Sequence, residues 1–160
     1  MTTAYRGKKN KNVSIKDAYE MAESLRIAHK LDGWRIQFDE SRSRFGQCRI
    51  GEHVISLSRP LVELNNMEEV KDTILHEIAH ALAPIGAHHN HAWKAVARSI
   101  GCRAERCYNA GSVITPPAKY NATCPACGRK IQRERKTTIA CNVCCKGKFQ
   151  AEYKFLWEKN

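Results

Sequence analysis

The sequence lacks any apolar run of the ~20 residues that a transmembrane helix requires, because charged residues interrupt every apolar stretch. The first residues carry charge but no apolar segment of the kind found in a signal peptide. Acidic residues are also scarce, with 16 Asp or Glu against 27 Lys or Arg. We therefore expect a soluble, cytoplasmic chain with no membrane association, and the net charge of +11 favours a polyanionic partner such as nucleic acid.

Internal repeats and low-complexity tracts are absent as well. The 160 residues suit one compact domain of roughly 100 residues or more with a small appendage. Pro116 and Pro117 separate two compositions, and the part that follows them holds ten Lys or Arg against three Asp or Glu. We predict a flexible basic arm at residues 1–12, a main domain at 13–117 and a small basic domain at 118–160.

Apolar spacing in the main domain predicts three helices and a small sheet. Helical periodicity covers residues 15–30, 66–83 and 91–100. Asn66 is the expected N-cap of the second helix, and Glu69 completes a capping box. Alternating apolar residues between the first two helices, at Trp34 to Phe38 and Val54 to Leu57, predict a sheet of three strands.

The middle of the second predicted helix reads His76-Glu77-Ile78-Ala79-His80. Histidines at positions i and i+4 project from one helical face about one turn apart, so both imidazoles can bind one Zn²⁺. Glu77 is poorly aimed to be a ligand in that geometry, but it can reach a zinc-bound water. This arrangement predicts that Glu77 is a general base.

A catalytic zinc site needs a third protein ligand, and three histidines follow the helix: His88, His89 and His91. When the third predicted helix is projected backward, His89 falls on the inward stripe that contains Trp93 and Val96. His91 falls on the exposed face. We therefore predict His89 as the third ligand, with His88 and His91 as alternatives because the geometry of the preceding loop is unknown.

These residues resemble the SprT-like family, also called Spartan-type proteases. The resemblance lies in HEIAHAL at residues 76–82, the His-x-x-x-Trp element at 89–93 and the hairpin stretch at 48–58, and it spans nearly the whole chain. The long metzincin pattern instead requires Gly at position 83 and His at position 86. This chain has Ala83 and Gly86, which excludes that class.

The resemblance implies an α+β, compact zincin-like fold of the minigluzincin type at residues 13–117. It also implies a zinc metalloprotease, with Glu77 as catalytic residue, that cleaves proteins bound or crosslinked to DNA. By analogy with such folds, an extended substrate pairs with an edge strand beside the active helix, and Val54–Ser58 is the candidate. We assume a monomer.

Two CxxC pairs separated by 13 residues predict a zinc ribbon in the last segment: Cys124 with Cys127, and Cys141 with Cys144. Four thiolates form a closed structural zinc site, which adds a second Zn²⁺ to the catalytic one and supplies folding free energy to a small domain. Cys145 is an alternative to Cys144. Alternation at 130–138 and 149–157 predicts strands. Three further cysteines are expected to be reduced, partly buried thiols: Cys48, Cys102 and Cys107.

Five basic residues lie on the predicted ribbon hairpin: Arg129, Lys130, Arg133, Arg135 and Lys136. They are near Tyr120 and the terminal aromatic residues, so together they can bind phosphates and stack on bases. This combination predicts a nucleic-acid-binding surface. The alternative is that the charges only solvate the small domain while the aromatic residues form its core.

Two other functions remain open. One is a non-enzymatic zinc-containing adaptor that binds nucleic acid, although a structural site would not need the carboxylate of Glu77. The other is a peptidase with no role at nucleic acid, for which binding to DNA would lack a strong salt dependence.

Overall fold

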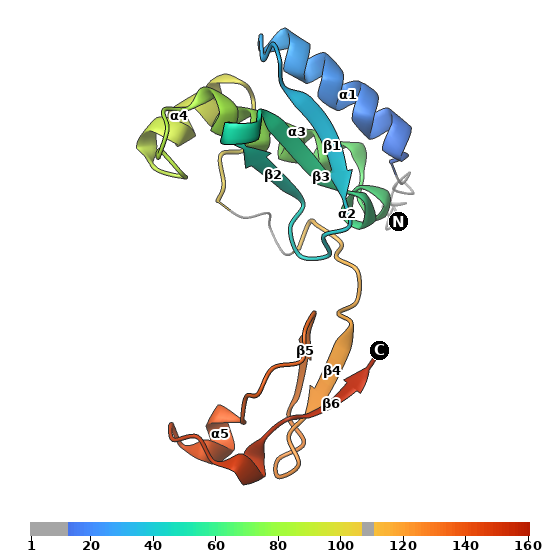
Figure 1. Cartoon of the computed structure of the whole chain (residues 1–160), viewed down its shortest axis with the longest axis vertical. Coiled ribbons are helices and arrows are strands. Elements are labelled where there is room, and N and C mark those ends of the chain that lie inside the picture. Colours follow the sequence, from blue (N-terminus) through green and yellow to red (C-terminus); the bar gives the residue numbers. More distant parts are fainter. Residues whose placement is uncertain (1–12, 107–110) are drawn as a thin grey trace, which may run out of the picture. The chain divides into compact units, whose positions relative to one another are not determined.

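The computed structural model describes residues 13–106 and 111–160 (Figure 1). The chain divides into two compact units, Met1–Pro116 and Pro117–Asn160. The predicted basic arm at residues 1–12 and the thiol of Cys107 lie outside the described residues. Across the described ranges, no helix has both the length and the apolar character needed to cross a membrane.

Helix α1 (Ile15–Ala28) begins where the hydroxyl of Ser14 accepts a hydrogen bond from the N–H of Asp17. Two alanines on its inner face are fully buried, which allows close packing. The chain then turns through Gly33, whose φ of 77° favours glycine. The helix predicted at residues 15–30 is confirmed, although it ends two residues earlier.

A three-stranded sheet follows, with β1 (Arg35–Asp39), β2 (Gly46–Arg49) and β3 (Val54–Ser58). Strand β3 lies in the centre, parallel to β1 and antiparallel to β2, and all five of its residues are buried. The prediction of three strands is confirmed. The prediction that Val54–Ser58 is an edge strand is wrong, because both sides of β3 are paired; β2 is an edge strand instead.

Three helices come after the sheet: α2 (Arg59–Leu64), α3 (Met67–Leu82) and α4 (His91–Ser99). With six residues, α2 is too short for periodicity to reveal. The side chain of Asn66 accepts a hydrogen bond from the N–H of Glu69, so the predicted N-cap of α3 is confirmed. The carboxylate of Glu69, which was predicted to complete a capping box, instead binds Arg103.

Helix α3 is packed on two sides. One side lies in the core formed with α1, α2 and the sheet, and it contributes three fully buried residues: Val70, Ile74 and Ile78. The other side packs against α4 through a second cluster that includes Leu75, Ala79, Trp93 and Ala97. Because both sides are buried, residues in the middle of α3 are held in fixed positions relative to β2 and α4.

The second unit contains a separate sheet of order β5-β4-β6, with β4 (Tyr120–Thr123), β5 (Lys130–Arg133) and β6 (Leu156–Lys159). Both pairings are antiparallel. Helix α5 (Asn142–Cys145) and the 3₁₀ turn η2 (Ala151–Tyr153) lie between β5 and β6 in the sequence. The buried core consists of four residues: Ala122, Cys124, Cys141 and Phe155. A core of this size needs additional stabilisation, such as a bound metal.

The strands predicted at residues 130–138 and 149–157 are correct only in part. Strand β5 covers the first four residues of the first range. In the second range, residues 151–153 form η2, and β6 begins only at Leu156. In one strand, Phe149 and Phe155 would lie on the same face, because they are an even number of residues apart. Phe149 is 62% exposed and Phe155 is buried, so residues 149–157 do not form a single strand.

Candidate metal centres

Helix α3 places His76 and His80 on one face, one turn apart. Side chains four residues apart lie above one another on a helix, and here the two Nε2 atoms are 3.2 Å apart. Burial lowers the pKa of each imidazole to about 4. Both rings are therefore neutral at physiological pH, and a neutral imidazole is the form that binds a metal.

The loop between α3 and α4 brings His89 to the same point. Two consecutive turns, closed by the N–H groups of Ala87 and Asn90, carry the chain back toward α3. The Nε2 atom of His89 then lies 3.0 and 3.1 Å from the Nε2 atoms of the two helical histidines. His89 therefore completes the three-histidine cluster, whereas His88 and His91 are exposed and are not members of it.

One indole supports all three imidazoles. Trp93 is fully buried, and its ring centroid lies 4.7 Å from that of His76, 5.1 Å from that of His80 and 4.7 Å from that of His89. Trp93 is on the first turn of α4, where the side chain of Asn90 caps the helix and accepts a hydrogen bond from the Trp93 N–H. The indole thus limits the orientations that the three rings can adopt.

The three histidines fit a zinc ion. Their Nε2 atoms are 3.0 to 3.2 Å apart, close to the edge of about 3.3 Å in a tetrahedron with Zn–N bonds of ~2.0–2.1 Å. Three neutral nitrogens at this separation repel one another unless a cation or shared protons lie between them. Three imidazoles leave one coordination position open, which is the arrangement of catalytic zinc sites.

Glu77 is buried beside this cluster but is not a member of it. Burial raises the pKa of its carboxyl group to about 8, and the backbone N–H of Cys48 on β2 donates a hydrogen bond to the carboxylate and opposes that rise. A carboxyl group with such a pKa can both accept and release a proton near neutral pH. Glu77 lines the same cleft as the three histidines.

A cleft of about 540 Å³ opens over these residues. Its lining includes His76, Glu77 and His80 from α3, together with Gly46 and Cys48 from β2. The segment after α4 forms another part of the wall, with Arg103, Glu105 and Arg106. The histidines and the carboxylate are therefore accessible to a ligand that enters the cleft.

Sequence patterns did not reveal two parts of this wall. Strand β2 has four half-buried residues and no apolar alternation, so periodicity does not predict that it faces α3. The segment after α4 carries charged residues that read as ordinary surface. Gly46 and Cys48 are visible in the sequence before the HExxH helix. Their contact with Glu77 depends on tertiary packing, so the sequence does not indicate it.

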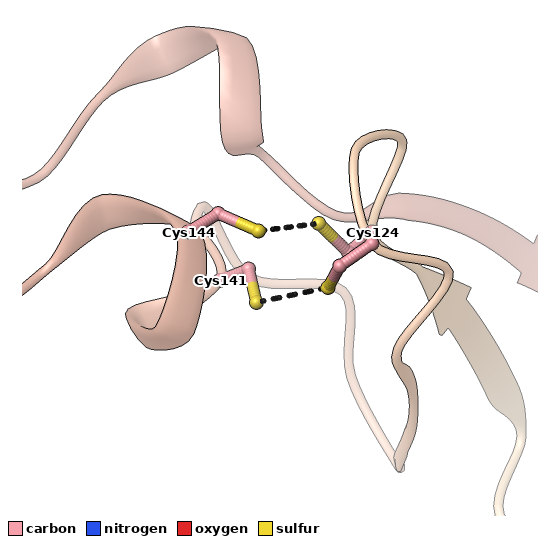
Figure 2. Close-up of side chains that lie close together, drawn as sticks. Cys124, Cys141 and Cys144 are labelled. Carbon is pink, nitrogen blue, oxygen red and sulfur yellow. Dashed lines mark hydrogen bonds between the residues drawn. The ribbon is translucent and has the colours of Figure 1, made fainter.

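The second unit holds a four-cysteine cluster, and Figure 2 shows sulfur atoms directed toward one another. The Sγ atoms of Cys124 and Cys144 are 3.8 Å apart, and those of Cys127 and Cys141 are 3.7 Å apart. Tetrahedral coordination with Zn–S bonds of ~2.3 Å requires a separation of about 3.8 Å. The cluster therefore fits a closed structural zinc site. Cys145, the alternative ligand, is buried outside this cluster, with its Sγ toward the carbonyl of Gln150.

Backbone groups prepare two of these thiols for metal binding. The N–H of Cys127 donates a hydrogen bond to Cys124 and lowers its pKa, and the N–H of Cys144 does the same for Cys141, whose pKa falls to about 7. Thiolates are the ligand form of cysteine. Outside the cluster, Cys48 is half-buried and Cys102 is buried, and both are free thiols.

The structure places the five predicted basic residues in different surroundings, although all are exposed. Arg133 is paired with Tyr120 across the strands, and the Nζ of Lys136 lies 5.2 Å from the centroid of the Tyr120 ring. Arg129 binds the side chain of Asn142 on α5. Lys130 lies at the other end of β5, and Arg135 follows the strand. Only part of the predicted set is therefore grouped around the aromatic side chain.

These features define a mixed α+β protein with two candidate zinc centres, an open one with three histidines and a closed one with four cysteines. The sequence model of the SprT-like family matches residues 15–113. The chain belongs to this family, whose members are associated with a metallopeptidase-like role. No curated protein and no solved structure matches the chain.

Proposed function

We propose that this protein is a zinc-dependent endopeptidase that acts on DNA-associated proteins. The observation that supports the proposal most strongly is the position of Glu77: a buried carboxylate beside three converging imidazoles, all facing one cleft. A purely structural zinc site has four protein ligands and needs no such carboxylate. We further propose a compact zincin-like fold of the minigluzincin type for residues 13–117 and a zinc ribbon for residues 118–160.

His76, His80 and His89 would hold the catalytic ion. When bound, Zn²⁺ supplies Lewis acidity, which lowers the pKa of a coordinated water and polarises the scissile carbonyl. Glu77 accepts a proton from the attacking water and later delivers it to the leaving amine. The hydrogen bond from the backbone N–H of Cys48 orients the carboxylate for this role.

An extended substrate is expected to pair with β2. This strand lines the cleft, and among the described residues its outer side has no partner strand. Because the N–H of Cys48 is bonded to Glu77, the substrate would use the other outward backbone groups of β2. Addition of a peptide strand to an exposed edge satisfies backbone hydrogen bonds without demanding a particular side chain. This proposal replaces the earlier expectation for Val54–Ser58, which is the central strand.

Binding to DNA is proposed for the ribbon. Tyr120 lies between Arg133 on β5 and Lys159 on β6 in the strand register, and Lys136 approaches its ring. An aromatic ring among three cations can stack on a base while the cations bind phosphates. Replacement of Arg133 and Lys136 by Gln should weaken binding to single-stranded DNA and reduce the slope of log K against log salt by about 1 to 2 units.

The test of the enzyme is Glu77→Gln, which keeps the size of the side chain and removes the base. Casein and DNA-bound histones would be used as substrates, with and without DNA. Cleavage by the variant should fall by roughly 10² to 10⁴-fold or more, with the zinc content and DNA affinity unchanged. Equal cleavage by the variant and the wild type would reject the proposed role of Glu77. Salt-dependent DNA binding by a wild type that cleaves nothing would favour the non-enzymatic adaptor.

A further inference from the structure

Gly46 on β2 lies in unusually close contact with the side chain of Glu77. A Cβ atom added to Gly46 would be 2.8 Å from both Cγ and Oε1 of Glu77, and 3.1 Å from its Cδ. Favourable contacts between carbon atoms are about 3.5–4.0 Å long. Any side chain at position 46 therefore requires Glu77 or β2 to move.

Backbone conformation does not explain this glycine. Among the described residues, five other glycines have positive φ angles: Gly33, Gly86, Gly101, Gly128 and Gly147. Gly46 is not among them, so an L-residue could adopt its backbone conformation. Gly51, just after β2, also has no positive φ, and a Cβ there would meet nothing within 4 Å. The steric requirement at position 46 thus comes from Glu77.

The hydrogen bonding of β2 places the carboxylate on the outer side of the strand. The N–H of Ser58 donates to the carbonyl of Phe45, so Phe45 directs this group toward β3. Backbone groups of alternate residues point in opposite directions within a pair of antiparallel strands. Gly46 and Cys48 therefore direct theirs away from β3, where the N–H of Cys48 meets Glu77.

A new side chain at position 46 would push the side chain of Glu77 toward the cleft that it lines. Glu77 is buried, and α3 is packed against an apolar cluster on each of two sides. The helix therefore cannot rotate without disturbing both clusters. The carboxylate can escape a methyl group on residue 46 only by leaving the N–H of Cys48. That movement would also change its orientation relative to the three histidines.

We infer that Gly46 is a positioning residue: the absence of its side chain, together with the N–H of Cys48, forms a seat that fixes the Glu77 carboxylate beside the histidine cluster. The existence of this seat depends only on the packing of β2 against α3. Its consequence for catalysis rests on the proposed peptidase function. The two parts can be tested separately.

The seat is tested by a double-mutant cycle on thermal stability in the zinc-loaded protein. Gly46→Ala should lower Tm when Glu77 is present. In the Glu77→Ala background, where the opposing side chain is missing, Gly46→Ala should leave Tm unchanged. Gly51→Ala is the matched control and should behave the same in both backgrounds. If Gly46→Ala folds only in the Glu77→Ala background, the seat is supported. An equal loss of Tm in both backgrounds would overturn it.

The positioning role is tested by kinetics on casein. For Gly46→Ala, kcat should fall roughly 100-fold with KM little changed, because the substrate still binds while the carboxylate is misplaced. The zinc content should equal that of the wild type, and Gly51→Ala should keep wild-type kcat. A wild-type kcat in Gly46→Ala would overturn the positioning role. If the wild type itself cleaves nothing, the proposed function fails, and the stability cycle still decides whether the seat exists.

Discussion

Arg103 binds the buried carboxylate of Glu69 through both terminal nitrogens of its guanidinium group. Glu69 is in the first turn of α3, where the helix dipole also favours a negative charge. The Nε of Arg103 forms a further ion pair with Asp72, one turn before His76, and the backbone N–H of Arg103 binds the same carboxylate. This contact attaches the segment after α4, which forms one wall of the cleft, to the helix that carries two of the candidate metal ligands.

Replacement of Arg103 by Met should lower the free energy of unfolding by ~2 kcal/mol, because the carboxylate of Glu69 stays buried without its charged partner, while the partial exposure of Arg103 reduces the cost. The additional change Glu69→Gln should recover part of the loss. Urea unfolding provides the measurement. Lys16→Met, which removes the exposed ion pair with Glu20, is the control and should cost less than ~1 kcal/mol. Similar losses for Arg103→Met and the control would contradict this prediction.

Metal content should distinguish the two centres. Elemental analysis of the wild type is expected to give two zinc ions per chain, one for each cluster. His76→Ala should lose the ion at the histidine cluster only, and Cys124→Ser combined with Cys127→Ser should lose the ion at the ribbon only. Retention of both ions after either change would show that the cluster concerned does not bind zinc.

Trp93→Phe should weaken zinc binding at the histidine cluster by about tenfold, because a smaller ring supports the three imidazoles less completely. Competition with a chromophoric chelator measures this affinity. The affinity of the four-cysteine site, which is in the other unit, provides an internal control and should not change. A zinc affinity at the histidine site equal to that of the wild type would show that the indole does not orient the ligands.

The stability of the metal-free protein should depend on pH through Glu77. Burial raises the pKa of this carboxyl group from 4.5 to about 8, so between these values the folded state binds more protons than the unfolded state. Stability contributed by this group is therefore lost as the pH rises from about 5 to 8. In Glu77→Gln the titration is absent, so the variant should gain stability relative to the wild type over that interval.

Urea unfolding at several pH values, with a chelator present, measures this difference. His76 and His80 act in the opposite direction, because burial lowers the pKa of each from 6.5 to about 4 and stability is lost as the pH falls through that range. Both proteins share this effect, so it cancels in the comparison. A stability difference between variant and wild type that is constant from pH 5 to pH 8 would contradict the prediction.

The elements that could be predicted from the sequence are those in which neighbouring residues determine the geometry. The helix that carries His76 and His80 follows from apolar periodicity and from the cap at Asn66, and both are confirmed. The short helix α2 and the turn at residues 151–153 gave no such signal, because neither is long enough to show a period. The terminal strand was misplaced because apolar residues alternate across residues 149–157, although the strand covers only residues 156–159.

Local spacing in the sequence is enough to show which side chains could meet a metal: two histidines one helical turn apart, and cysteines with two residues between them in each CxxC pair. The backward projection of the third helix already favoured His89, and the structure places it, rather than His88 or His91, in the first cluster. Tertiary structure alone decided that β3 lies in the centre of its sheet and that Gly46 faces Glu77. These relationships join segments that are distant in the chain. They depend on how β2, α3 and α4 pack together, and local sequence patterns do not encode that packing.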